Sequence, residues 1–308
     1  MLEAVPLVSR LAVCILFSPF LLGVIGKTKA FFAGRIGPPF LQPYYDIFKL
    51  IQKGSVYSLT TTWIFRAAPL ISMSAVLTAS ILIPFGGLKA PMQFWGDALI
   101  FAALFGLARF FTILAALDTG SSFEGMGASR EAAFSCLSEI ALFLNFAVLV
   151  VLSKSFSLSG MIGGRPWSSW ATMGPSLILV ILSYFMIVLV ENSRIPIDDP
   201  ATHLELTMIH EVMVLDHSGP DFAFILYGGA IKLFVLGGFL VTILVPFQFH
   251  GGIMDAVVFL SGMVVLAVVI GIVESAMARF RLNRISSFIT ASFVLALLGL
   301  VIALSRVL

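Results

Sequence analysis

Ionisable side chains stand at several positions where the surrounding sequence is apolar. Arg109, Glu139 and Lys232 each lie well inside an apolar run, and Glu191 and Glu274 close two other runs. A charge at the centre of a bilayer costs about 2.5–3.5 kcal/mol on insertion scales, so such groups normally face the interior of a helix bundle and pair there. The pattern favours a polar path for protons or for conformational coupling. Buried pairs that only fix the register of the helices are the alternative.

A second group of ionisable residues fills the polar segment 191–221. It holds seven carboxylates and a single arginine, Arg194. Crowded carboxylates raise one another's pKa, which suits groups that exchange protons near neutral pH. A solvated acidic loop that docks a basic partner is the other interpretation. His203, His210 and His217 recur every seven residues, and titration or partner contact is favoured over metal ligation because metal-binding pairs are more often four residues apart.

Other kinds of chemistry lack their motifs. Cys14 and Cys136 both lie in apolar runs, and no Cys-x-x-Cys spacing occurs, which argues against a cysteine-ligated zinc or iron–sulfur site. The fourth histidine, His250, lies between runs, so a bis-histidine haem has no ligands within them. Neither a nucleophile elbow, nor a His-Glu-x-x-His zinc motif, nor a P-loop occurs. The sequence therefore predicts no catalytic, cofactor-binding or metal site in this chain.

Composition determines what kind of element must position these charges. Of 308 residues, 59% are hydrophobic and 11% are charged, with a mean hydropathy of +1.08. A soluble domain carries about 25% charged residues. The net charge of +2 is too small to indicate a nucleic-acid partner. Runs of the roughly 20 apolar residues that span a bilayer occur at 5–26, 63–85, 98–117, 131–152, 171–190, 222–245, 253–274 and 285–304. The chain is predicted to be an all-α integral membrane protein, a single membrane domain over 1–308 with about eight transmembrane helices.

Two amphipathic segments stand between the spans. In residues 42–53 apolar side chains recur from Tyr44 to Ile51 with helical spacing, and Lys49 lies on the opposite face. This pattern predicts an interfacial helix, with a connector tucked between spans as the alternative. Within 191–221, the segment from Leu204 to Leu215 is predicted to form a second short amphipathic helix.

The distribution of basic residues predicts the orientation. Eight spans place both termini on one side of the membrane, together with the even-numbered loops. The odd-numbered loops and their edges hold eleven basic residues: Lys27, Lys29, Arg35, Lys49, Lys53, Arg66, Arg130, Arg194, Arg279, Arg281 and Arg284. The opposite side holds five: Arg10, Lys89, Lys154, Arg165 and Arg306. By the positive-inside rule the odd-numbered loops are cytoplasmic and both termini face outward.

Four motifs in order carry a resemblance to a known family. They are Gly34-Arg-Ile-Gly-Pro-Pro with Asp46-Ile-Phe-Lys49, the segment 117–131, Glu191-Asn-Ser-Arg-Ile-Pro-Ile-Asp198, and Glu274-Ser-Ala-Met-Ala-Arg279. Together they resemble the subunit 1 family of respiratory complex I, and most of all its branch in formate hydrogenlyase and hydrogenase-4 type complexes. The likeness extends over essentially the whole chain.

The resemblance implies a non-catalytic subunit of a multi-subunit oxidoreductase in the plasma membrane of a prokaryote. Such a subunit is the membrane foot of the redox arm and begins a line of buried charges that leads to antiporter-like subunits. Iron–sulfur clusters and a nickel–iron centre are expected in the small and large subunits of a hydrogenase, and no cofactor in this chain. Combined with the charges inside the apolar runs, the candidate coupling path comprises Arg109, Arg130, Glu139, Glu191, Arg194, Asp198, Glu205, Glu211, Lys232 and Glu274. The candidate docking residues are Arg35, Asp46, Lys49, Asp118 and Glu124.

Departures from the family pattern separate the alternatives. The segment 39–41 before Gln42 is shorter than in quinone-reducing members, which favours the hydrogenase branch over a complex I-like subunit that forms part of a quinone site. Ala201 stands where complex I members commonly have a glutamate, so the row of carboxylates has one member fewer at this position. Asp216 lies slightly later than the usual glutamate. A secondary transporter that works alone is a third interpretation, but the inverted repeats with broken helices that it would need are not visible.

Overall fold

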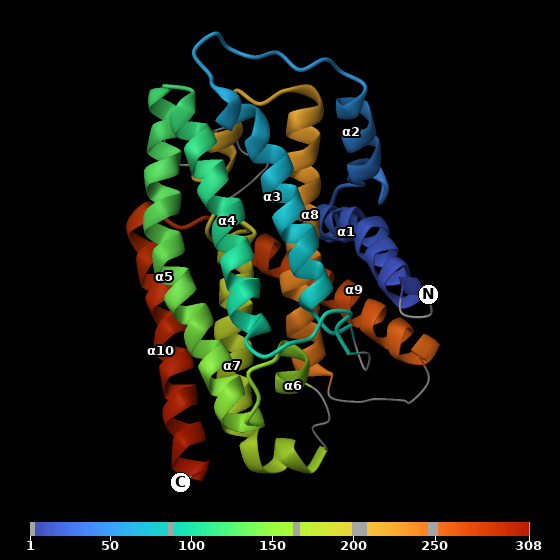
Figure 1. Ribbon diagram of the computed structural model, residues 1–308, viewed down its shortest axis with the longest axis vertical. Coiled ribbons are helices and arrows are strands. Elements are labelled where there is room, and N and C mark those ends of the chain that lie inside the picture. Colours follow the sequence, from blue (N-terminus) through green and yellow to red (C-terminus); the bar gives the residue numbers. More distant parts are fainter. Residues whose placement is uncertain (1–3, 86–88, 163–166, 199–207, 246–251, 308) are drawn as a thin grey trace.

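The computed structural model describes residues 4–85, 89–162, 167–198, 208–245 and 252–307. Its long elements are α1 (Ala4–Phe32), α3 (Trp63–Leu82), α4 (Asp97–Asp118), α5 (Ser122–Ser153), α7 (Trp167–Glu191), α8 (Gly219–Leu244), α9 (Gly252–Ala276) and α10 (Leu282–Val307). All eight contain a segment long and apolar enough to cross a membrane. The prediction of an all-α protein with about eight spans is confirmed (Figure 1).

Three short helical elements connect the long ones. They are α2 (Gln42–Ile51), α6 (Leu158–Ile162) and a 3₁₀ turn, Glu211–Val214. The predicted interfacial helix 42–53 corresponds closely to α2. The second predicted amphipathic helix is wrong where it can be compared: residues 208–210 are not helical and only the 3₁₀ turn follows. Its first residues, 204–207, lie outside the described part of the chain.

Seven of the eight predicted spans are shorter than their helices, because hydropathy detects only the part that suits hydrocarbon; the exception is 63–85, whose helix α3 ends at Leu82. The largest difference is in α5, which begins at Ser122 and not at 131. The segment 122–130 is polar, but an α-helix satisfies its own backbone and continues without apolar side chains. The predicted loop 118–130 therefore shrinks to the three residues 119–121, and Arg130 lies on a helix and not in a loop.

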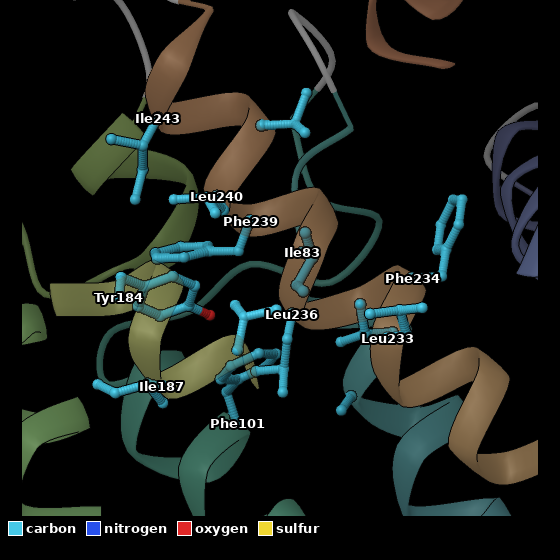
Figure 2. Packing of buried hydrophobic residues seen from close by; sticks show 14 of the residues in the cluster. Ile83, Phe101, Tyr184, Ile187, Leu233, Phe234, Leu236, Phe239, Leu240 and Ile243 are labelled. Atoms are coloured by element: carbon cyan, nitrogen blue, oxygen red, sulfur yellow. The ribbon is translucent and has the colours of Figure 1, made fainter. Parts of the chain in front are cut away.

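α8 runs through the centre of the bundle and buries more of its surface than the other long helices. It packs on α3, α1, α2, α9 and α7, while α10 packs on α5 and α7. Aromatic side chains fill the centre: Phe239 of α8 lies against Tyr184 of α7, and Phe101 of α4 lies close by (Figure 2). These side chains are fully buried. Because lipid is as apolar as this core, such helices associate through close packing and interhelical hydrogen bonds.

A polar seam inside the apolar bundle fixes α7 between α5 and α10. The Asn145 amide of α5 donates to the Ser183 hydroxyl of α7 at 2.8 Å, and Ser183 in turn donates to the carbonyl of Ser292 in α10 at 2.8 Å. All three residues are buried. The seam lies two turns before Glu191 on α7, so it sets the rotation of the helix that presents this carboxylate.

α2 lies on the surface of the bundle against α1 and α8 (Figure 1). No residue of α2 is buried, which favours the predicted interfacial position over a tucked connector. The Tyr44 hydroxyl donates to the carbonyl of Leu16 in α1. On the same predicted apolar face, Phe48 is 63% exposed and Ile51 is 49% exposed, so half of that face remains open to lipid or to a partner.

Replacing Gly23 with alanine is expected to loosen the segment that leads into α2. A Cβ atom at Gly23 would lie 1.9 Å from the carbonyl oxygen of Phe40, whereas one at Gly26 on the same helix would meet only Pro38 at 4.0 Å. Forcing backbone apart in this way costs about 1–3 kcal/mol. Thermal unfolding of the purified protein should therefore begin at a lower temperature in Gly23→Ala and stay unchanged in Gly26→Ala. Equal melting of the two variants would contradict this packing.

Candidate functional site

Four ionised side chains from four helices meet in the interior of the bundle. Glu191, at the end of α7, lies 2.9 Å from the ammonium of Lys232 in α8 and 3.4 Å from the guanidinium of Arg109 in α4. Arg109 also donates to Glu139 of α5 at 3.0 Å. The hydroxyl of Ser138, beside Glu139, donates to Glu191 at 2.7 Å. These contacts define the central cluster: Arg109, Ser138, Glu139, Glu191 and Lys232.

Burial divides the central cluster into an inner and an outer part. The side chains of Arg109, Glu191 and Lys232 are 7%, 6% and 14% exposed, whereas Glu139 is 37% exposed. When all four ionisable members are charged, the two cations Arg109 and Lys232 balance the two carboxylates Glu139 and Glu191. Charges removed from water need such partners, because an unpaired one is strongly destabilising. A proton on Glu191 would leave Arg109 and Lys232 with Glu139 as their only carboxylate in the cluster, so the charge state of Glu191 determines the balance.

A second cluster ties α9 to α1 and to the loop after α7. Glu274, with a fully buried side chain, lies 2.9 Å from Lys29 and 3.5 Å from Arg194. Lys29 stands in the last turn of α1 and Glu274 near the end of α9. Both basic groups come from different elements than the carboxylate, so the cluster also holds the bundle together at this level.

Asp198 anchors the segment that follows α7. Its carboxylate lies 2.8 Å from Arg279 and accepts the backbone N–H groups of Ile209 and His210 at 2.9 and 3.1 Å. The Asp198 side chain is 1% exposed. From α5, Arg130 donates to the carbonyl of Met208 at 2.9 Å. These bonds fix residues 208–210 against the bundle, although the chain between 198 and 208 lies outside the described residues.

His210 pairs with a carboxylate of α5. Its Nδ1 lies 3.4 Å from Glu131. Burial alone would lower the pKa of His210, but the Glu131 carboxylate overrides this effect and raises the pKa. The imidazole is therefore charged over a wider pH range than a free histidine.

One large cavity brings the clusters together. It encloses about 340 Å³, enough for a small ligand or a chain of waters. The charged residues on its wall are Arg109, Glu191, Arg194, Asp198, His210, Glu211 and Lys232. Most of the remaining wall is apolar and comes from α3, α4 and α8, including Val76 and Phe105. The Lys232 ammonium lies 5.9 Å from the centre of the Phe105 ring, so a charged and an aromatic group are neighbours on this wall.

Most of the predicted path residues lie in these clusters. Arg109, Glu139, Glu191 and Lys232 form one, and Arg194 and Glu274 share another. Glu205 lies outside the described residues. The partners that the sequence did not identify as path residues are Lys29, Glu131, Ser138, His210 and Arg279. Arg279 and Glu131 lie within the family motifs, and His210 is one of the histidines spaced seven residues apart. The neighbouring sequence gave no indication of which residues they contact.

The five predicted docking residues differ in position. Arg35, Asp46 and Lys49 are exposed on the segment around α2. Asp118 accepts from the backbone and the hydroxyl of Thr62 at 2.6 and 2.9 Å, where α3 begins. Glu124 is fully buried and accepts from the backbone N–H of Asp216 at 3.0 Å. Glu124 therefore holds the backbone at Asp216 in place and is not exposed on the surface of this chain.

The histidines show no metal arrangement within the described residues. No group of three or more potential ligands occurs there, and His203 and His250 lie outside that part of the chain. His210 faces Glu131, whereas His217 stacks on Phe65 with parallel rings whose centres are 3.9 Å apart. The two histidines therefore do not share a site.

The burial of His217 predicts a pH dependence of stability. Burial lowers the pKa of His217 from 6.5 to about 4. The unfolded chain takes up a proton at His217 near pH 6.5 and the folded chain only near pH 4, so folding stability falls as the pH decreases through that interval. The full loss is about 3 kcal/mol. Thermal melting at pH 7, 6, 5 and 4 should show a steeper decline in the native protein than in His217→Phe, which keeps the ring stack. Parallel curves would contradict the prediction.

Comparisons with known proteins agree on one family. The family described as NADH dehydrogenase matches residues 5–304. Formate hydrogenlyase subunit 4 of Escherichia coli is 30% identical over 302 residues, which cover 96% of this chain and 97% of that protein. Hydrogenase-4 component C of the same organism is 28% identical over 297 residues, covering 94% and 93%. A subunit of the NADH-quinone oxidoreductase of Syntrophobacter fumaroxidans is 29% identical over 293 residues, covering 89% and 86%.

A solved structure has the same fold. A chain in the membrane-bound sulfane sulfur reductase, an archaeal respiratory membrane complex, superposes with a TM-score of 0.84 over 98% of this chain and all of that chain. The two share 19% sequence identity.

Proposed function

The chain belongs to the NADH dehydrogenase subunit 1 family, and on that premise we propose that its central cluster links a redox reaction in partner subunits to proton movement across the membrane. The chain is a multi-pass membrane subunit of an energy-converting complex of this kind. The observation that carries the proposal is the position of Glu191, buried between Arg109 and Lys232 on the wall of the large cavity. A change of charge beside the cavity acts strongly on this carboxylate, because the interior of the bundle screens electrostatic interactions poorly.

A nickel–iron hydrogenase is the proposed redox partner. Similarity over almost the full length of two hydrogenase-type subunits at 30% and 28% identity supports this branch, as does the short segment before α2. The partners would then be an iron–sulfur small subunit, a nickel–iron large subunit and antiporter-like membrane subunits. This chain supplies the coupling path and no redox centre, and its odd-numbered loops face the cytoplasm of a prokaryote with both termini outside.

In the proposed mechanism the electron-transfer step changes the electric field at the large cavity. An added negative charge favours protonation of Glu191, which releases Arg109 and Lys232 from one of their two carboxylates. The two cations then repel each other and attract the next carboxylates, Glu139 among them. The path residues thus act as a chain in which each charge change shifts the proton affinity of the next group.

Reversal of the exposed charges around α2 is expected to release the redox arm. Arg35 and Lys49 are exposed beside the open apolar face of α2, and charge complementarity governs the docking of such surfaces. In Arg35→Glu with Lys49→Glu, retention of hydrogenase activity and of nickel on washed membranes should fall about tenfold. The matched control is Lys89→Glu with Lys154→Glu, which reverses two exposed charges at the opposite end of the bundle. Equal retention in both variants would contradict docking at α2, and a purified complex without nickel would contradict the hydrogenase branch.

A quinone site is the second candidate function, and the large cavity favours it. At about 340 Å³ with largely apolar walls and a few charged groups, the cavity has the character of a small-molecule site. Extraction of lipid from the purified complex would distinguish the two candidates. A stoichiometric amount of quinone in the native complex that is lost in Val76→Trp, which fills the cavity, would support a quinone site. Absence of quinone from the native complex would indicate that the cavity holds water.

A further inference from the structure

A second, smaller cavity adjoins the central cluster at Glu191 and Ser138, and neither Arg109 nor Lys232 lines it. Its wall includes Glu131, Ser135, Ser138, Glu191 and Ser193, contributed by α5 and the end of α7. The space open to the centre of a water molecule is about 10 Å³, close to what one water requires, and several polar groups are at hand to bind it. Glu191 is on the wall of both cavities.

The two faces of Glu191 differ in charge. On the side of the large cavity it meets Arg109 and Lys232 at 3.4 and 2.9 Å. These cations repel a proton that approaches from there. The wall of the small cavity includes neither cation, and Glu191 shares this wall with Ser138 and with the Glu131 carboxylate. The Ser138 hydroxyl donates at 2.7 Å to the same Glu191 oxygen that faces Arg109. A proton that approaches Glu191 from the small cavity therefore meets no cation on the cavity wall.

Glu131 connects the small cavity to the large one. Its carboxylate lines the small cavity and lies 3.4 Å from Nδ1 of His210, which lines the large cavity. Three groups surround His210. Glu131 of α5 faces its ring, Asp198 accepts from its backbone N–H, and Lys232 shares the wall of the large cavity with it. His210 is therefore a titratable group that lines the large cavity and also lies against Glu131.

We propose that a single water molecule bound in the small cavity completes a proton relay from His210 through Glu131 to Glu191, which bypasses Arg109 and Lys232. In one transfer His210 gives its Nδ1 proton to Glu131, and Glu131 passes a proton to the water. The water gives another of its protons to Glu191. His210 ends neutral, Glu131 returns to its ionised form, the water is unchanged and Glu191 becomes a neutral acid. This relay rests on the proposed coupling function and identifies the route by which the proton enters the central cluster.

Three variants test the relay in the intact complex, by proton uptake into membrane vesicles measured beside redox turnover. Glu131→Gln removes the acid–base step, and Ser135→Val fills the small cavity without changing a titratable group. Both are expected to slow proton uptake by about a hundredfold with redox activity in the presence of an uncoupler preserved. The matched control is Ser129→Val, because Ser129 donates to a carbonyl three residues back in α5 just as Ser135 does but lines neither cavity. Ser129→Val should transport protons normally.

The third variant, Glu191→Gln, separates failure of the relay from failure of the proposed function. Normal uptake in Glu131→Gln or Ser135→Val, with uptake lost in Glu191→Gln, overturns the relay and keeps the coupling function. Normal uptake in Glu191→Gln overturns both. If Glu131→Gln does not assemble, a high-resolution electron-microscopy map of the native complex still decides, since density for one water between Glu131 and Glu191 is expected and an empty cavity overturns the relay.

Discussion

Glu191→Gln is expected to abolish proton movement by the complex while its partner subunits continue to turn over. Glutamine keeps the shape of the side chain, and its carbonyl oxygen can still accept from Ser138 and face Arg109. Its amide NH2 group then replaces the carboxylate oxygen that faces Lys232, so this one contact is lost. What is lost is the ability to take up and release a proton. A positioned acid–base group contributes about 10²- to 10⁴-fold to a proton-transfer step, and loss of that factor makes uptake too slow to follow the redox reaction.

Vesicles that contain the complex provide the measurement, with proton uptake and redox turnover recorded in the same sample. The control is Glu139→Gln. Glu139 is 37% exposed and contacts only Arg109 within the central cluster, so fewer groups depend on its charge than on that of Glu191. We expect Glu139→Gln to slow uptake far less than Glu191→Gln. The reverse order would place the critical carboxylate on α5 and not on α7.

Asp198→Ala is expected to have the largest effect on stability. The variant removes the partner of Arg279 and the acceptor of two backbone N–H groups at a position where the carboxylate is 1% exposed. Breaking a buried ion pair by removing one member costs about 3–5 kcal/mol, because the other charge and the donors stay without compensation. The melting temperature of the purified complex should fall accordingly, and residues 208–210 should become accessible to proteases.

Two further variants isolate the cause. Asp198→Asn keeps an acceptor oxygen for Ile209 and His210 but loses the charge opposite Arg279. It should therefore be less destabilising than Asp198→Ala. In the double variant Asp198→Ala with Arg279→Ala the cation that faced the carboxylate is also gone, so the loss should be smaller than the sum of the two single losses. Strict additivity would show that the pair does not contribute to anchoring the segment.

Hydropathy was sufficient to predict the spans because each spanning helix must contain an apolar run of bilayer length. Hydropathy was insufficient at the ends of the helices, since α5 begins nine residues before its predicted start at 131. The helix expected over Leu204 to Leu215 failed at 208–210, because Asp198 and Arg130 hold the backbone there in a bent form. A tertiary contact of this kind overrides local helical spacing, and a single sequence does not reveal it.

The central cluster illustrates the same limit. Charges inside apolar runs identified Arg109, Glu191 and Lys232 as buried, and the structure pairs them. The pairing itself depends on helix packing between residues 41 to 82 positions apart, which leaves no periodic signal. Glu131 did not stand out because it lay at the predicted edge of a span, beside a polar loop. Once α5 is seen to begin at Ser122, Glu131 and Ser138 are seven residues apart on one face of the helix, and both line the small cavity.

The claim that Glu191 changes its protonation when the partner subunits change their redox state can be tested by infrared difference spectroscopy of the intact complex. Reduction should produce a band in the carbonyl stretching region of a protonated carboxyl group, and this band should shift in deuterium oxide. We predict that the band disappears in Glu191→Gln and persists in Glu139→Gln. A redox-induced carboxyl spectrum that is identical in the native complex and in Glu191→Gln would contradict the claim.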